Sequence, residues 1–177
     1  MNVTYRDVDF DSRADCELLA RWYNDPEIKH LYSRFSDADS FSKEFTFRYF
    51  QRVGQVPITG GPHRNLLVLA DGIPVGQASF EIDTSKLLTK IPGTAWISLM
   101  IGDHSLRRCG LGTDITAHLE MLAARSGADR IEIGVFEYNK RALKFFAGLK
   151  YHEFIRRPAR VWWDGRMWAE IRLLKTL

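Results

Sequence analysis

The sequence has little cysteine and no long apolar run, and both absences narrow the kind of protein it encodes. Among its 177 residues are two cysteines, Cys16 and Cys109, too few for a disulfide framework. No apolar stretch reaches membrane-spanning length, and the first residues lack the apolar run of a signal peptide. We therefore expect a soluble protein of the reducing cytoplasm with no membrane partner.

An excess of one charge is also missing. The chain has 25 Lys and Arg against 22 Asp and Glu, a net charge of +3. A nucleic-acid-binding domain usually presents a dense basic face, so we expect no nucleic-acid partner. No set of His, Cys, Asp and Glu has metal-ligand spacing, and we expect no metal. The apolar content of 45% can supply a full core, and the length predicts one domain over residues 1–177.

Apolar periodicity and turn residues predict alternating strands and helices. The predicted strands are 3–8, 65–70, 73–82, 94–101, 130–136, 151–156, 160–163 and 166–174, and the predicted helices are 12–23, 40–52, 110–124 and 139–147. The central strand–helix–strand order implies a parallel pair, whereas the hairpins imply antiparallel neighbours. The fold class is therefore α/β, a mixed, twisted central sheet flanked by helices on both faces.

A glycine-containing loop stands between a predicted strand and a predicted helix. Strand 94–101 is followed by Arg107-Arg108-Cys109-Gly110-Leu111-Gly112-Thr113. Glycine lets the backbone approach an anion closely, and a helix start offers unpaired N–H groups and a positive dipole end. With two arginines beside it, this loop is suited to a pyrophosphate. A lone Gly-x-Gly pattern is weak evidence, because structural turns carry it at least as often.

Other features narrow the choice. The loop has neither the nucleoside-triphosphate pattern nor the three-glycine dinucleotide pattern, and the next helix opens with Asn139-Lys140-Arg141-Ala142. The two motifs together resemble those of the GNAT family of acetyl-CoA-dependent N-acetyltransferases, and the resemblance covers essentially the whole chain. Segments 21–26, 100–103 and 113–114 look like the branch with ribosomal-protein N-terminal and polyamine acetyltransferases.

The resemblance implies a role for each matching residue. Backbone groups of Met100 and Ile101 would pair with the pantetheine arm of acetyl-CoA, and amides of 108–113 would hold its pyrophosphate. Asn139 would contact the cofactor or a water near the thioester, and Arg141 would lie near the nucleotide. The cofactor-binding set implied is Met100, Ile101, Arg107, Arg108, Cys109, Gly110, Leu111, Gly112, Thr113, Asn139 and Arg141.

The chain departs from the family pattern in the helix that follows Asn139. Family members often carry a tyrosine seven residues after this asparagine, where it can protonate the leaving thiolate, but this chain has Phe146. Water or another group, such as Tyr138, would then supply the proton. Lys150 replaces the usual glycine near the helix end, which we expect to change only that end.

Several side chains are candidates for work on the acceptor. An alkylammonium has a pKa near ~10, so a base or a water chain must deprotonate it. Glu81 and Asp83 end a predicted strand and are equally well explained as a solvated edge; of the two, Glu81 is our predicted base. Alternation with Ile131 and Ile133 places Glu132 on an exposed strand face, and the helical spacing of His118 predicts a packed side chain.

The sequence says less about which residues line the acceptor site and which could form a subunit interface. The resemblance implies that the second predicted helix and the loop before it shape the acceptor site, which makes Tyr32, Arg34 and Phe45 substrate candidates. Trp162, Trp163 and Trp168 cluster at the terminal hairpin, where sheet packing or a homodimer interface would explain them.

These observations predict an enzyme that moves acetyl from acetyl-CoA to a primary amine. The acceptor could be a protein N-terminus, a polyamine, an amino sugar or an antibiotic, and the sequence does not choose among them. The alternative is a non-catalytic acyl-CoA-binding or sensor module, to which Phe146 gives some weight. A nucleic-acid binder is disfavoured by the modest charge.

Overall fold

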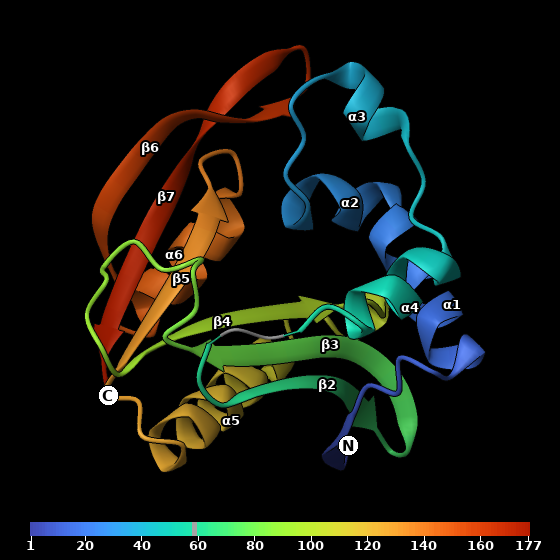
Figure 1. Ribbon diagram of the computed structural model, residues 1–177, viewed down its shortest axis with the longest axis horizontal. Coiled ribbons are helices and arrows are strands. Elements are labelled where there is room, and N and C mark those ends of the chain that lie inside the picture. Colours follow the sequence, from blue (N-terminus) through green and yellow to red (C-terminus); the bar gives the residue numbers. More distant parts are fainter. Residues whose placement is uncertain (58–59) are drawn as a thin grey trace.

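A seven-stranded sheet with helices on both faces forms the protein (Figure 1), in a computed structural model that describes residues 1–57 and 60–177. The strands are β1 (Val3–Asp7), β2 (His63–Ala70), β3 (Ile73–Ile82), β4 (Thr94–Ile101), β5 (Arg130–Phe136), β6 (His152–Trp163) and β7 (Arg166–Thr176). The helices are α1 (Arg13–Asn24), α2 (Pro26–Tyr32), α3 (Ala38–Ser42), α4 (Phe47–Gly54), α5 (Leu111–Arg125) and α6 (Lys140–Gly148). A short 3-10 helix covers His104–Leu106. The predicted α/β class is confirmed.

The sheet order is β1-β2-β3-β4-β5-β7-β6, and its centre is parallel. β4 and β5 pair in parallel at three positions, Thr94–Trp96 against Arg130–Glu132. The pairs on either side, β3 with β4 and β5 with β7, are antiparallel and continue to the carboxyl ends of β4 and β5. The two central strands therefore part after three residues while each keeps its outer neighbour, and Figure 1 shows β5 rising away from β4.

Two hydrophobic clusters cover the two faces of the sheet. Alternate residues of β2 to β5 and β7 pack on α5 and α6, with Ile97, Ile115 and Ile131 fully buried. The other face, at the β2–β4 side, packs on α1, α2 and α4 through Leu67 and Met100. Figure 1 shows α5 on one side of the sheet and α1, α2 and α4 on the other. This arrangement leaves residues of β4, β5 and β7 beyond the second cluster available for a site.

The predicted helix 40–52 is wrong, because two short helices replace it. α3 ends at Ser42, and α4 begins only at Phe47, with Thr46 capping it through a bond from Tyr49 N–H. Between them, the Asn24 side chain donates to the Phe45 carbonyl at 2.7 Å and accepts from the Phe45 N–H at 2.8 Å. A side chain from α1 thus satisfies the backbone groups that a continuous helix would have used.

The predicted strands 151–156 and 160–163 form the single strand β6. Its register against β7 shifts between Arg157 and Val161, where Ala159 has a φ of 50°. Pro158 has no N–H to donate, so the ladder bulges past it and then resumes. The turn between β6 and β7 is the predicted Asp164-Gly165.

The β6–β7 hairpin reaches across to the segment between α2 and α3 (Figure 1). Trp162 N–H donates to the Phe35 carbonyl at 2.8 Å. Trp163 stacks on His30 with ring centroids 4.2 Å apart, and the Trp168 indole donates to the Trp163 carbonyl at 2.9 Å. Contacts within one chain therefore engage all three tryptophans, and the homodimer remains a prediction.

An ion pair ties β1 to α1. The Arg6 guanidinium donates to both oxygens of Asp15, at 2.6 and 2.7 Å, and the Asp9 N–H donates to the same carboxylate at 3.0 Å. These bonds, led by that from Arg6, outweigh the opposing effect of burial and lower the pKa of Asp15. The charged form of Asp15 is therefore favoured in the folded protein.

We expect Asp15→Asn to make the free energy of unfolding less dependent on pH in acid. A carboxyl whose pKa is lowered by folding stabilises the protein above its unfolded value of about 4, and this contribution is lost as pH falls through the folded value. The variant should be less stable than wild type at pH 7, and the difference should shrink below about pH 4. Urea unfolding from pH 7 to pH 3 measures it. Asp7→Asn, which breaks an exposed pair with Arg64, is the control.

Candidate functional site

A cavity of about 690 Å³ lies between β4 and β5, where the two strands part. Residues 97–101 of β4 line it on one side and residues 133–136 of β5 on the other. The first residues of α5 and α6 close one end, which we call the loop end. The volume suits a ligand of cofactor or drug size. Backbone groups of β4 that would face β5 in a continuous sheet have no β5 partner in the register beyond Trp96.

The loop end is formed by the glycine loop predicted to bind an anion. Gly110 precedes α5 with φ 91°, and it gives the helix no side-chain cap. A Cβ at Gly110 would have no atom within 4 Å, so the space beside it is open. The N–H groups at the start of α5 are thus available to an anion, at the positive end of the helix dipole.

The arginines of the loop end divide into two roles. Arg107 donates to Glu27 at 3.1 Å and to the Ile101 carbonyl at 3.3 Å, so it fixes the loop against α2 and β4. Arg108 and Arg141 also line the cavity, and neither has an ion-pair partner within the described parts of the chain. Their charges are therefore available to a ligand.

Asn139 stands where α6 begins and lines the same cavity. Its Oδ1 accepts the Ala142 N–H at 3.1 Å, which leaves its amide hydrogens for a ligand or water. Phe146 also lines the cavity and is buried against Phe145 and Tyr151, so this position has no proton to give. Tyr138 is poorly placed to supply the proton that Phe146 lacks. Its hydroxyl donates to the His30 carbonyl, and it is not a lining residue.

The opposite end of the cavity is polar. We call this the polar end; its lining residues are Tyr32, Arg34, Lys86, Trp96, Ser98 and Glu170. The hydroxyls of Tyr32 and Ser98 form a hydrogen bond, and burial raises the pKa of Tyr32 to about 12. Tyr32 therefore keeps its proton at neutral pH.

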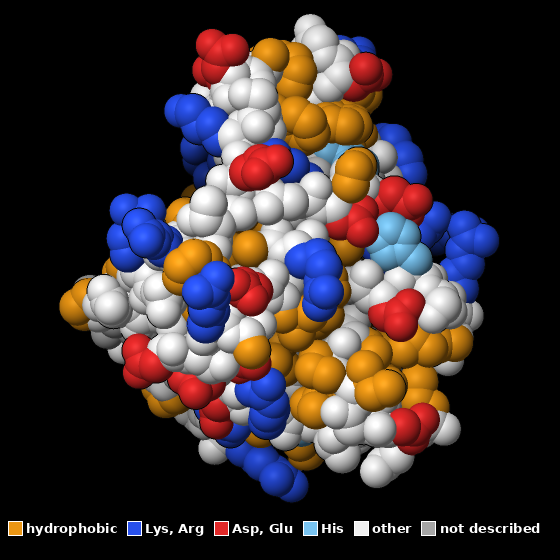
Figure 2. Space-filling view, turned by 90° about the vertical axis from the view of Figure 1, so that its right-hand side faces the viewer, with side chains coloured by type: hydrophobic (Ala, Val, Ile, Leu, Met, Phe, Trp, Pro, Cys, Tyr) orange, Lys and Arg blue, Asp and Glu red, His pale blue; other side chains and the backbone are white. Residues whose placement is uncertain are grey.

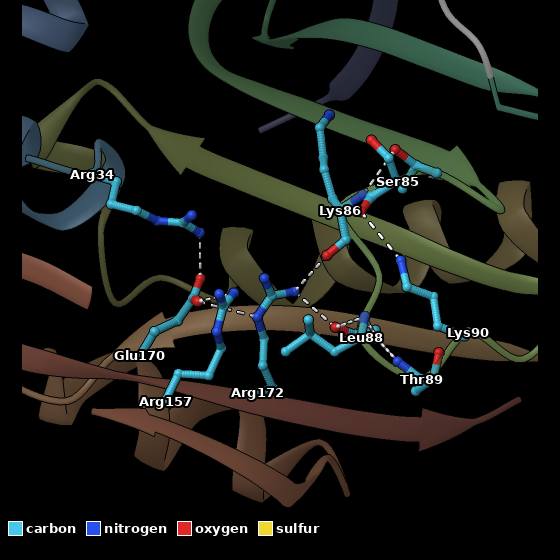
Figure 3. A network of polar contacts seen from close by, with 11 residues as sticks. Arg34, Ser85, Lys86, Leu88, Thr89, Lys90, Arg157, Glu170 and Arg172 are labelled. Carbon is cyan, nitrogen blue, oxygen red and sulfur yellow. Dashed lines mark hydrogen bonds and ion pairs between the residues drawn. The ribbon is translucent and has the colours of Figure 1, made fainter. Parts of the chain in front are cut away.

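A buried charge network forms the floor of the polar end (Figure 3). Glu170 accepts from Arg34 at 2.7 Å and from Arg157 at 3.3 Å, and Arg172 Nε lies 3.4 Å from the same carboxylate without a well-aligned hydrogen bond. Gly134 of β5 leaves room for it, because a Cβ there would lie 2.9 Å from Glu170 Oε1. The carboxylate is thereby held at the cavity wall.

The prediction that Glu132 lies on an exposed strand face is wrong, since its side chain is fully buried. Arg172 Nη1 donates to it at 2.7 Å, and the N–H groups of Leu88 and Thr89 donate at 3.0–3.1 Å. Arg172 also donates to the Lys86 carbonyl at 3.1 Å. The pair thus fixes the loop that follows β3, as Figure 3 shows for Arg172 and the Lys86 backbone.

We expect Glu132→Ala to lower the free energy of unfolding by about 3–5 kcal/mol, because it leaves the Arg172 charge buried without its nearest partner. Equilibrium urea unfolding measures the loss. Glu132→Gln, which keeps the shape and an acceptor oxygen, should lose less. Equal stability of the alanine variant and wild type would show that the pair contributes nothing to folding.

The structure brings most predicted site residues to one cavity. Those that line it are Tyr32, Arg34, Met100, Ile101, Arg107, Arg108, Gly110, Gly112, Thr113, Asn139 and Arg141. Leu111 packs in the core beneath α5, and Phe45 packs edge-on against Tyr23 and Tyr49. Cys109 is exposed, with Sγ 2.8 Å from the Leu106 carbonyl.

The acidic and histidine candidates lie outside the cavity lining. Glu81 holds Lys86 in an ion pair at 2.7 Å, and this bond is the main influence that lowers its pKa against the effect of burial. Asp83 accepts the Gly93 N–H at 2.9 Å and so closes the loop after β3. His118 stacks on Tyr5 at 3.7 Å, as expected for a packed side chain.

Sequence reasoning missed Lys86, Trp96, Ser98, Gly134 and Glu170. Three of these, Trp96, Ser98 and Glu170, carry a signal that could have found them. Trp96 and Ser98 alternate with buried Ala95 and Ile97, so they share the sheet face opposite α5. An acid in the apolar run of β7 also indicates a buried, partnered charge, because an unpaired one would be too costly to bury.

The charge distribution on the surface and the character of the helices also bear on the expectations from sequence. Figure 2 shows acidic, basic and apolar side chains interspersed over the face turned toward the viewer. Within residues 1–57 and 60–177, every helix is too short or too polar to cross a bilayer.

Comparison with known proteins agrees with the geometry. The sequence pattern of the acetyltransferase (GNAT) family matches residues 18–151. No curated protein matches the chain in sequence.

Solved structures match over almost the full length at low identity, which shows the fold alone. A phosphinothricin acetyltransferase from Sinorhizobium meliloti in complex with acetyl-CoA has 16% identity and a TM-score of 0.73, covering 100% of this chain and 89% of its own. A spermidine N-acetyltransferase from Vibrio cholerae in complex with CoA and spermine has 15% identity and a TM-score of 0.74. The match covers 98% of this chain and 95% of that protein. A ribosomal-protein-alanine N-acetyltransferase from Brucella melitensis has 16% identity and a TM-score of 0.69. The match covers 98% of this chain and 99% of that protein.

Proposed function

The chain belongs to the GNAT family of acetyltransferases, and from that premise we propose that it transfers acetyl from acetyl-CoA to a primary amine by direct attack in a ternary complex. The observation that carries the proposal is the cavity between the parted β4 and β5, with an anion-binding helix start at one end and polar side chains at the other. A module that only bound acyl-CoA would have no use for the polar end.

The loop end and the parted strands fit acetyl-CoA. Backbone groups of Met100 and Ile101 would bind the pantetheine arm as a further strand, since β5 does not pair with them. Amides from 108 to 113, with Arg108, would hold the pyrophosphate, and Arg141 would lie near the nucleotide. When bound, acetyl-CoA supplies an acetyl group activated as a thioester.

The residues of the chain must then orient the amine and move its protons. We propose that Asn139 positions a water or the cofactor through its free amide hydrogens. Glu81 would accept the amine proton through water, because its carboxylate is charged at neutral pH and its partner Lys86 lines the cavity. We propose that the hydroxyl of Ser98 or Tyr32, both at the polar end, supplies a proton to the leaving sulfur.

The remaining features of the enzyme are also proposals. We propose the cytoplasm as its compartment, since two cysteines without a disulfide framework suit a reducing environment. We also propose a homodimer, because the cluster of tryptophans in the terminal hairpin would suit a subunit interface.

We expect wild-type protein to bind acetyl-CoA in the micromolar range and Gly110→Val to abolish binding. A branched side chain at φ 91° strains the loop and fills the space through which the backbone meets the anion. Isothermal titration calorimetry measures the affinity.

Gly72→Val is the matched control for this variant. Gly72 has φ 83° in the β2–β3 turn, and a Cβ there also meets nothing within 4 Å. Both variants place a valine at a similar positive φ, and only Gly110→Val should lose binding. Unchanged affinity in Gly110→Val would remove the loop from the cofactor site.

We expect Glu81→Gln to lower the rate of acetyl transfer most at low pH. Free amine is scarce there, so the step that removes its proton limits the rate. A pH–rate profile of thiol release between pH 6 and about pH 9 tests this. Asp83→Asn, at the same edge of the sheet, is the control. A profile identical to wild type would eliminate Glu81 as the base.

A further inference from the structure

The polar end contains more basic than acidic groups, and this excess bears on the acceptor. Its charged lining residues are Arg34, Lys86 and Glu170. In the network around them, Arg34, Arg157 and Arg172 face Glu132 and Glu170, which leaves one positive charge unmatched among residues 1–57 and 60–177. Lys86 and Glu81 balance each other at 2.7 Å.

Glu170 is not a free carboxylate for a cationic acceptor. It is buried, with Arg34 and Arg157 as hydrogen-bond donors and Arg172 within ion-pair distance. A second ammonium group, such as a polyamine carries, would have to displace a guanidinium to reach it. A polyamine therefore meets repulsion at the polar end rather than a binding group.

Arg34 differs from Arg172 of the same network because it is placed to bind a ligand. Its side chain is 45% exposed and lines the cavity, whereas that of Arg172 is 3% exposed. Within the described residues its one hydrogen bond runs from Nη2 to Glu170, so its other N–H donors are unused. A guanidinium fork matches the two oxygens of a carboxylate.

The backbone beside Arg34 is fixed in place. Phe35, next to it, is buried, and its carbonyl accepts the Trp162 N–H at 2.8 Å from the β6–β7 hairpin. Glu170 holds the far end of the side chain, and Figure 3 shows Arg34 reaching toward it. A donor set held at both ends loses little conformational freedom when a ligand binds.

We propose that the acceptor is an amine that carries a carboxylate, as in a free amino acid, and that Arg34 binds this carboxylate with its unused donors. The unmatched positive charge of the network is then neutralised by the acceptor. This inference rests on the proposed acetyl transfer and names the acceptor class for the same site.

Matched trios of acceptors test the acceptor class. For each of several amino acids with small, aliphatic and aromatic side chains, thiol release from acetyl-CoA is measured with the acid, its amide and its decarboxylated amine. Spermidine is added as a polyamine. We expect kcat/KM to be at least tenfold higher for the acid than for its partners. Equal or higher values for amides, amines or spermidine would overturn the inference and leave acetyl transfer standing.

Arg34→Gln tests the residue. We expect at least a tenfold rise in KM for the acids with little change in kcat, and loss of the preference over amides. Arg13→Gln removes an exposed arginine of α1 and is the control. Arg157 and Arg172 still hold Glu170 in Arg34→Gln, and urea unfolding verifies the fold. A variant that keeps the preference would contradict the role of Arg34.

A binding measurement distinguishes a wrong acceptor class from a wrong assignment of acetyl transfer. Calorimetry with CoA-saturated protein should detect the preferred acid in wild type and not in Arg34→Gln. Protein that binds acetyl-CoA but neither binds nor acetylates any acid of the panel contradicts the acceptor class. Protein that does not bind acetyl-CoA at all contradicts the proposed function itself.

Discussion

The site depends on the parting of β4 and β5 after three residue pairs. β4 stays bonded to β3 and β5 to β7 along their lengths, so the sheet divides into two stiff halves. α5 follows β4 and α6 follows β5, which brings both helix starts to the open side of the gap. Ligands of open α/β sheets likewise bind beyond the carboxyl ends of parallel strands. The gap thus provides unpaired backbone, an anion site and a cavity together.

Local features of the chain explain what the sequence could predict. β4 and β5 begin and end at the predicted residues, because apolar runs bounded by turn residues specify strands locally. The loop before α5 was also predictable, since its glycines, arginines and helix start lie within seven residues. The helix predicted over 40–52 failed because Asn24, distant in sequence, bonds both backbone groups of Phe45.

The polar end as a whole could not be predicted in this way, because four separate segments build it. Tyr32 ends α2 and Arg34 follows it, Lys86 comes from the loop after β3, and the rest come from β4 and β7. Alternation along β5 placed Glu132 in solvent, yet Arg172, 40 residues away, keeps it buried. Which charges pair across strands is a property of the fold, and period-two patterns record only which residues share a face.

The buried network therefore has a meaning beyond stability. Well-packed apolar residues can often replace buried ion pairs without loss of folding free energy, so packing alone does not require charges here. In this chain the network occupies the cavity wall, where Gly134 has no side chain to cover Glu170. Glu132 fixes Arg172, Arg172 and Arg157 flank Glu170, and Glu170 holds Arg34 at the cavity. A chain of charges that begins in the core thus sets the position and sign of the group that meets the acceptor.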